Sequence, residues 1–220
     1  MTRWPAPGRC KRRLAVGTGA RCAAAIQARL TAHAVAAARQ AILRGGQRPG
    51  AEPPELVLAT DGLALRAAQR WGRALGADRV RLQGGGGLGV RLRRQLHRAR
   101  VEGARAVVVV GSDLPELTAA DLLAAFEALE QVPLVLGPAR DGGYWLIGLA
   151  DAALADPAGA SAALFAGHRR PIPWGREPVL AQTLAAAKAA GLPWQLLAER
   201  ADLDRPEDLQ AWRGSRGAGG

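Results

Sequence analysis

The chain has 220 residues, of which 49% are hydrophobic and 22% are charged, values typical of a soluble globular protein with one sizeable core. The formal net charge is +11, yet Lys11 and Lys188 are the only lysines, so the positive charge is almost entirely arginine. No apolar run reaches the roughly 20 residues that span a bilayer, and two cysteines cannot form a disulfide framework. The composition therefore excludes a membrane-embedded protein and a disulfide scaffold, and it predicts a cytoplasmic protein.

The excess of arginine has two explanations. An anionic partner such as nucleic acid would account for it, and so would the alanine, glycine and arginine bias of a GC-rich genome. Because no Lys/Arg run exceeds three residues, we favour the genomic bias and do not expect nucleic acid as the partner.

Helices and strands alternate along the predicted chain. Apolar residues at helical spacing, together with glycine stops, predict helices over residues 20–43, 62–75, 88–99, 118–129, 176–190 and 206–212. Short apolar runs after turn residues predict strands over residues 55–60, 80–83, 106–111, 133–137, 144–149 and 193–198. This alternation predicts an α/β fold in which helices cover both faces of a mostly parallel sheet, a three-layer αβα arrangement. We expect a single domain over residues 1–212 and a disordered tail over residues 213–220.

The strongest strand signal leads into an acidic residue. Four consecutive valines, residues 107–110, are followed by Gly111, Ser112 and Asp113. A central parallel strand is buried on both faces, which explains a run without polar alternation. Ligands of such sheets bind beyond the carboxyl ends of the strands, where Asp113 could hold a metal ion or a ribose. A simple turn or cap before Pro115 explains the same residue equally well.

Two segments have the residues of a phosphate site. Residues 83–91, QGGGGLGVR, place glycines before a helix N-terminus, where unpaired N–H groups and the helix dipole attract anions. Residues 7–15, PGRCKRRLA, place Lys11, Arg12 and Arg13 after a Pro-Gly turn, where they could bind phosphate oxygens. A plain flexible loop and a solvated basic segment stay open as the alternatives.

Two further segments combine aspartate with turn residues. Residues 137–149, GPARDGGYWLIGL, form either a hairpin turn or a close approach of backbone to a ligand that Asp141 and Tyr144 face. Residues 202–209, DLDRPEDL, place two acids before Pro206. Asp204 is there either a helix N-cap or, with Asp113, part of a hard-cation site.

Taken in order, six motifs resemble one family. PGRCKRRL, QGGGGLGVRL, GSDLPEL, LGPARDGGYWLIGL, IPWGREPVLAQTL and DLDRPEDL are similar to motifs of the bacterial radical-SAM/selenodomain-associated transferases of the first type. The resemblance covers the chain from Pro7 to about Leu209. It implies the glycosyltransferase-A fold, that of the nucleotide-diphospho-sugar transferases, and a relationship to small nucleotidyltransferases.

The resemblance also implies roles for individual residues. Nucleotide contacts are expected from Gly8, Lys11, Arg13, Gln83, Gly84, Gly86, Arg91 and Ser112. The acceptor is expected beside Asp141, Gly142, Gly143, Tyr144 and Trp174. A site for Mg²⁺ or Mn²⁺ is expected at Asp113, Asp202 and Asp204, by analogy with the nucleotidyltransferases. Catalysis is assigned to Asp113, Lys11 and Asp141.

These implications predict a metal-dependent transferase that uses a nucleotide-activated donor, with a nucleotide-sugar as the first choice and a small molecule as acceptor. A nucleotidyltransferase that releases pyrophosphate from a nucleoside triphosphate is the alternative within the same fold. A non-catalytic protein that binds nucleotides or nucleic acid is the alternative from another class. The sequence predicts no oligomeric state.

One expectation concerns the start of the chain. The family begins with an apolar strand before the Pro-Gly turn, and Met1, Thr2, Arg3 and Trp4 stand in its place. We therefore expect the first central strand to be missing. We also expect the genomic sequence upstream of Met1 to encode, in frame, about 5–6 apolar residues of a typical strand.

Overall fold

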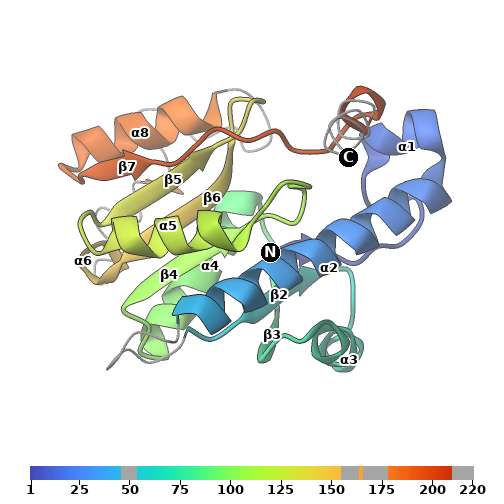
Figure 1. Cartoon of the computed structure of the whole chain (residues 1–220), viewed down its shortest axis with the longest axis horizontal. Helices are drawn as coiled ribbons and strands as arrows, with labels where there is room; N and C mark the ends of the chain where they lie inside the picture. The colour runs from blue at the N-terminus through green and yellow to red at the C-terminus, as the bar shows by residue number, and fades with distance from the viewer. Residues whose placement is uncertain (46–53, 155–163, 166–177, 210–220) are drawn as a thin grey trace. The chain divides into compact units, whose positions relative to one another are not determined.

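The structure, a computed structural model, describes residues 1–45, 54–154, 164–165 and 178–209 (Figure 1). Two compact units make up the chain. The first comprises Met1–Leu82, Gly111–Ala119 and Ala201–Gly220, and the second comprises Gln83–Val110 and Ala120–Arg200. Trp174 and the predicted tail, residues 213–220, lie outside the described residues. The single domain expected over residues 1–212 stays a prediction.

In the part of the first unit that the structure describes, a parallel sheet is accompanied by three helices and a further helical turn. Its sheet has the order β1-β2-β3, formed by Thr2–Arg3, Val57–Asp61 and Arg79–Leu82. Its helices are α1 (Arg12–Thr18), α2 (Ala20–Gly45) and α3 (Leu65–Leu75), and residues 206–209 form a further helical turn. The sequence predicted α2, α3, β2 and β3, whereas α1 falls in a segment that was interpreted as a basic turn.

The first strand is short rather than missing. Thr2 pairs with Thr60 and Arg3 pairs with Asp61, both in parallel register. The expectation that residues 1–4 supply no strand is therefore wrong for these two residues. Trp4 continues the contact by donating its N–H to the carbonyl oxygen of Asp61 at 2.8 Å.

A glycine on α3 sets how closely that helix packs on the sheet. Gly72 is buried, and a Cβ atom at this position would overlap Val80 of β3. The nearest atom of Leu58 on β2 lies 3.3 Å from the same point. Glycine usually weakens a helix interior, but a side chain here would push α3 away from the sheet that it covers.

Both ends of the chain contribute to one hydrophobic cluster of the first unit. Leu14 of α1 and Leu30 of α2 are buried together with Leu203 and Leu209. Burying a leucine side chain stabilises a fold by about 1.5–3 kcal/mol. The cluster therefore joins the basic segment near Lys11 to the acidic segment that carries Asp204.

Within the described residues, the second unit contains a mixed sheet and four helices of four residues or more. The strand order is β4-β6-β5-β7, formed by Ala106–Val110, Tyr144–Ala150, Leu134–Pro138 and Trp194–Leu196. The helices are α4 (Leu88–Val101), α5 (Ala119–Leu129, whose first residue belongs to the first unit), α6 (Asp151–Leu154) and α8 (Val179–Ala189). None of the described helices combines the length and the apolar character needed to cross a bilayer.

Strand β6 runs against the expected parallel direction. It pairs antiparallel with β4 and with β5, while β5 and β7 are parallel. The five-residue segment from Ala139 to Gly143 joins β5 to β6 and is too short for a crossover helix, so the chain must reverse. The hairpin reading of this segment is thereby confirmed.

The strand of four valines differs from the expectation. We expected β4 to be a parallel strand buried on both faces, but it pairs antiparallel with β6 and is half-buried along its whole length. The completely buried strand is β5, and β6 is buried except at its two ends. An apolar run alone does not distinguish a central strand from its neighbour.

Candidate functional site

Three motifs that lie far apart in the sequence meet at the ammonium group of Lys11. Its Nζ lies 2.6 Å from Oδ1 of Asp113 and donates a hydrogen bond to the carbonyl oxygen of Leu203. The Lys11 side chain is 3% exposed, whereas that of Asp113 is 51% exposed. A buried ammonium therefore bridges the loop after β4 to the acidic segment near the end of the chain.

The backbone of Lys11 is strained. Its φ of 45° and ψ of 47° place it in the left-handed region, where it is the only residue other than glycine among those described. This conformation costs an ordinary residue about 1–2 kcal/mol. Such strain persists only where the surroundings fix it, and it concentrates at functional sites. The two partners of the ammonium and the start of α1 fix it here.

A second ion pair joins the same two segments. Nη1 of Arg13 lies 3.0 Å from Oδ2 of Asp204, and the two side chains are 63% and 34% exposed. The backbone N–H of Leu203 donates to the carbonyl oxygen of Asp113 at 2.9 Å. The acidic segment is thus held to Asp113 through its backbone and to α1 through its side chains.

The helical turn at residues 206–209 is capped by Asp208. Its Oδ2 accepts the N–H groups of Asp204 and Arg205 at 2.9 and 2.7 Å. A carboxylate that reaches back from the third helical position is the second half of a capping box, and Pro206 stands at the first position. The sequence allows Asp204 as the residue that caps this helix, but Asp208 caps it. The Asp204 carboxylate instead pairs with Arg13.

Two other predicted nucleotide contacts lie in this unit. Gly8 has a φ of +75° and forms the turn before Cys10 and Lys11. Ser112 is buried, and its hydroxyl hydrogen-bonds Gln27 and Thr2. We expected Ser112 to face a nucleotide, but its side chain is directed into the interior of the protein.

The predicted metal ligands do not form a three-carboxylate group. Among the described residues, no cluster of three or more His, Cys, Asp or Glu side chains could hold an ion. Oδ1 of Asp113 is paired with Lys11, and Oδ2 of Asp204 with Arg13. Mg²⁺ is commonly held by one or two carboxylates together with substrate phosphates. The half-exposed carboxylate of Asp113 fits that kind of site, whereas a site built from protein oxygens alone does not fit.

The glycine loop of the second unit is held by arginines from α4. Nη1 of Arg94 donates to the carbonyl oxygens of Gln83 and Gly85 at 2.6 and 3.0 Å. Nε of Arg91 donates to the carbonyl oxygen of Gly86 at 2.8 Å. Arg91 and Arg94 of α4 thus hydrogen-bond three backbone carbonyl oxygens of the loop.

The side chain of the buried residue Gln83 also belongs to this arrangement, since Nη1 of Arg91 lies 3.4 Å from its Oε1. Gly84 and Gly86 have φ values of +77° and +99°. Only glycine adopts this region at little cost. The conformation of the loop thus depends on these two glycines and on the hydrogen bonds that its carbonyl oxygens accept from the arginines.

The predicted acceptor residues form the turn between β5 and β6. Oδ1 of Asp141 accepts the N–H of Gly143 at 2.9 Å, and the carbonyl oxygen of Gly142 accepts the N–H of Leu180. Burial raises the pKa of the Tyr144 phenol, although a hydrogen bond with Thr183 acts in the opposite direction. Tyr144 therefore stays protonated, and Asp141 holds the turn while remaining exposed.

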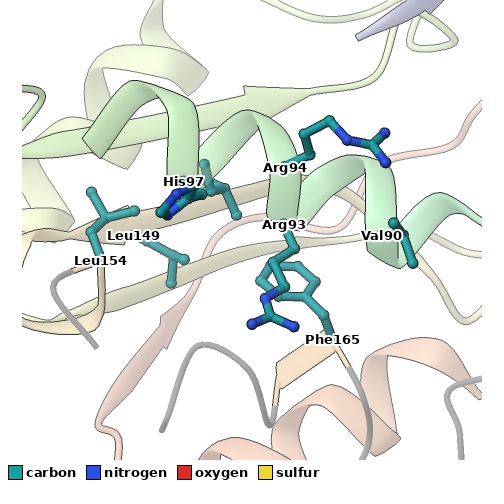
Figure 2. A pocket seen from close by; sticks show the side chains of 8 residues that line it. Val90, Arg93, Arg94, His97, Leu149, Leu154 and Phe165 are labelled. Atoms are coloured by element: carbon teal, nitrogen blue, oxygen red, sulfur yellow. The ribbon is translucent and has the colours of Figure 1, made fainter. Parts of the chain in front are cut away.

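A cavity of about 260 Å³ lies in the second unit (Figure 2). Its lining residues are Val90, Arg93, Arg94, Leu96, His97, Leu149, Leu154 and Phe165. Figure 2 shows Arg93 and Arg94 extending in different directions from α4. The sequence assigned no function to these residues.

Family membership follows from comparison of the sequence. A profile of the family described as "Uncharacterized protein conserved in bacteria (DUF2064)" matches residues 42–175. The chain belongs to this family. Among curated proteins, no sequence matches it significantly.

Solved structures show the fold. The crystal structure of a putative nucleotide-diphospho-sugar transferase from Desulfovibrio desulfuricans G20 matches with a TM-score of 0.73 and 27% identity, over 93% of this chain and 80% of that chain. This match confirms the predicted fold class, that of the nucleotide-diphospho-sugar transferases. The association with radical-SAM proteins stays a prediction.

Two further structures are more distant. The CMP:2-keto-3-deoxy-manno-octonic acid synthetase complexed with CTP has a TM-score of 0.48 and 14% identity, over 82% of this chain and 87% of that chain. Rv0371c of Mycobacterium tuberculosis, in complex with manganese, has a TM-score of 0.42 and 18% identity, over 81% and 86%. At these scores neither match carries an argument about function.

Proposed function

We propose that this protein is a transferase that uses a nucleotide-activated donor, with a nucleotide-sugar as the donor class and a small molecule as the acceptor. The observation that carries the proposal is the meeting of Lys11, Asp113 and the acidic segment around Leu203. The name of the Desulfovibrio protein, a nucleotide-diphospho-sugar transferase, supports the donor class. Both cysteines are free thiols, which suits a reducing cytoplasm.

Arg13 is the residue best placed to bind a donor phosphate directly. Its side chain is 63% exposed, and its guanidinium can form paired hydrogen bonds to phosphate oxygens. The ammonium of Lys11 is enclosed by Asp113 and Leu203. It therefore attracts a donor phosphate by its positive charge at a distance, and it could contact the phosphate directly only if its ion pair with Asp113 opened. A fixed cation near a leaving phosphate stabilises the charge that develops there.

Asp113 would hold Mg²⁺ or Mn²⁺ together with the phosphates of the donor. When bound, such an ion neutralises negative charge on the leaving group. Asp202 and Asp204 lie on the segment that is hydrogen-bonded to Asp113, and Asp204 keeps Arg13 in place. The contacts expected between the glycine loop from Gln83 to Gly86 and a nucleotide, and between the Asp141 turn and an acceptor, concern the second unit and stay predictions.

Thermal-shift titration tests the donor class. Nucleoside diphosphate-sugars, nucleoside triphosphates and nucleosides are each added with MgCl₂ or with EDTA. A ligand that binds the folded state at 100 times its Kd stabilises it by about 2.7 kcal/mol. We expect a diphosphate-sugar to raise the melting temperature in the presence of Mg²⁺. If no nucleotide raises it with any divalent ion, the proposal is overturned.

Other outcomes identify the alternatives. Stabilisation by a triphosphate but not by a diphosphate-sugar would indicate a nucleotidyltransferase. Binding of single-stranded nucleic acid that weakens steeply with salt, without need of a divalent ion, would indicate a non-catalytic binding protein.

Two neighbouring arginines provide a matched test of the phosphate contact. Arg13→Gln should weaken a nucleotide by roughly tenfold or more, because a hydrogen bond between charged groups contributes about 1.5–3 kcal/mol. Binding of the corresponding nucleoside should stay unchanged. Arg12→Gln, which removes an equal charge from an exposed position, should have little effect on either ligand. Equal losses for the two variants would refute a specific role for Arg13.

Asp113→Asn tests the metal ligand. The variant should bind the nucleotide with the same affinity in MgCl₂ and in EDTA, because an amide is a poor ligand for Mg²⁺. If the variant still binds the nucleotide more tightly in MgCl₂ than in EDTA, as the unmodified protein does, Asp113 is not the metal ligand and only shapes its loop.

A further inference from the structure

Four buried polar residues form a closed hydrogen-bonded ring that includes Ser112, the neighbour of Asp113. The ring closes through the backbone carbonyl oxygen of Gln27 and not through its side chain. Nε2 of Gln27 lies 2.9 Å from Oγ of Ser112, which lies 2.9 Å from Oγ1 of Thr2. Oγ1 of Thr2 lies 2.9 Å from Oγ1 of Thr31, which donates to the carbonyl oxygen of Gln27 at 2.9 Å. The ring starts and ends at Gln27 of α2. It includes β1 and the loop that carries Asp113.

The protons of the ring run in one direction. Thr31 gives its proton to the carbonyl oxygen of Gln27, and Ser112 gives its proton to Thr2. The contact between the two threonines is therefore satisfied when Thr2 donates to Thr31. Each hydroxyl then donates to the next member of the ring, and Nε2 of Gln27 also lies 3.4 Å from Oγ1 of Thr2 and 3.3 Å from Oγ1 of Thr31. Hydrogen bonds in such chains strengthen one another. The side-chain amide of Gln27 is within hydrogen-bond distance of all three hydroxyls.

Ser112 transmits this arrangement to the site. Residues 111–114 alternate between exposed and buried, with Ser112 and Leu114 directed inward and Asp113 outward. The Ser112 hydroxyl is the polar anchor of this turn, and the next residue carries the carboxylate that binds Lys11. A shift at Ser112 would move Asp113 relative to a lysine that is itself fixed by Leu203.

We propose that Gln27 is a positioning residue for Asp113, acting through Ser112. All four members of the ring are at most 5% exposed, so a ligand reaches none of them directly. A set of satisfied polar groups in an interior is often replaceable by apolar side chains at little cost in stability. A positioning role differs from a purely stabilising role, because it requires that the Asp113 carboxylate moves when a hydrogen bond of the ring is removed.

The two lysines of the chain provide a direct measurement. Lys188 is exposed on α8, whereas the ammonium of Lys11 is buried and hydrogen-bonded. In protein labelled with ¹⁵N at lysine Nζ, the Lys11 ammonium should give a slowly exchanging signal that the Lys188 ammonium lacks. Gln27→Met, which keeps the volume and removes the amide, should shift that signal and speed its exchange by about tenfold or more.

Two further variants complete the test. Thr31→Val opens the ring on the side away from Asp113 and should have the same effect, which covers a failure of Gln27→Met to fold. Gln95→Met replaces another buried glutamine, on α4 of the second unit, and should leave the Lys11 signal unchanged. An unchanged Lys11 signal in folded Gln27→Met and Thr31→Val protein would overturn the positioning role.

Nucleotide affinity supplies a second readout, and this part rests on the proposed function. Gln27→Met should lower the affinity in MgCl₂ by about tenfold, or 1.4 kcal/mol, and should have no effect in EDTA. If the Lys11 signal shifts but the unmodified protein binds no nucleotide, the positioning role stands and the proposed function fails. If nucleotide binds and folded Gln27→Met shows neither change, the positioning role fails alone.

Discussion

The pairing of a buried lysine with a half-exposed aspartate predicts an unequal double-mutant cycle. Removing one partner of a fully buried pair costs about 3–5 kcal/mol, because the other charge stays in the interior without compensation. In Asp113→Ala that charge is the enclosed ammonium of Lys11, which keeps only the carbonyl oxygen of Leu203. Since the Asp113 side chain is 51% exposed, water can replace part of the lost contact. We therefore expect a cost of about 2 kcal/mol, below the value for complete burial.

The reverse substitution should cost less. Lys11→Met leaves Asp113 free to bind water, and the main loss is one hydrogen bond to Leu203, about 1 kcal/mol. Lys11→Met/Asp113→Ala should be about as stable as Lys11→Met alone, because the unpaired buried charge is absent from both. The two substitutions should therefore be non-additive by about 2 kcal/mol.

Urea unfolding of the four proteins measures this cycle. At the melting temperature, 2 kcal/mol corresponds to a shift of about 4–8 °C for a chain of this length. The exposed pair of Arg13 and Asp204 serves as the control, and its coupling should not exceed about 1 kcal/mol. Additive effects at Lys11 and Asp113, or a larger loss in Lys11→Met than in Asp113→Ala, would refute the reasoning from burial.

Three other predictions concern features away from this ion pair. Cys10 is buried, and desolvation raises the pKa of its thiol. A thiol reagent should therefore modify Cys10 at least about tenfold more slowly than the exposed Cys22. Equal rates would contradict the burial. Gly84→Ala should cost about 1–2 kcal/mol in urea unfolding, because φ is +77° and the new Cβ would lie 2.6 Å from a guanidinium nitrogen. Gly85→Ala, with no atom within 4 Å of the new Cβ, should be close to neutral, and equal costs would refute the argument. Desolvation of Asp78 raises its pKa, but hydrogen bonds to backbone and arginine outweigh this and leave that pKa below its usual 3.8. Its contribution to stability should then be complete above about pH 5 and lost as the pH falls below 3.8, and Asp78→Asn should remove this acid sensitivity.

The sequence predicted the main elements because their signals are local. Glycine stops end α2 and α3 near the expected residues, and apolar runs mark β2, β5 and β6. The apolar run of β6 does not show its direction, since such a run carries no information about its partner strand, and the hairpin was one of two interpretations of the segment before it. Yet the turn that reverses the chain, with Asp141 accepting the N–H of Gly143, is visible in the sequence as an Asp-Gly-Gly motif.

The sequence named candidate site residues but not the contacts between them, and their functional roles stay predictions. Order along the chain identified Lys11, Asp113 and Asp204, which the structure brings into one network of ion pairs and backbone hydrogen bonds. Burial of the Lys11 ammonium and the inward direction of Ser112 depend on tertiary packing, which no local pattern contains. Gln27 had no signal at all, because a single glutamine in an alanine-rich helix resembles a surface residue.

The hydrophobic cluster formed by Leu14, Leu30, Leu203 and Leu209 has a consequence for synthesis on the ribosome. The first unit is built from three separate stretches of chain, and the last of them, which begins at Ala201, emerges after the whole second unit. Contacts between residues so distant in sequence form late, because a long loop must close first. Until then, Leu14 and Leu30 lack two of their apolar partners, and the nascent first unit exposes a surface that a chaperone could bind.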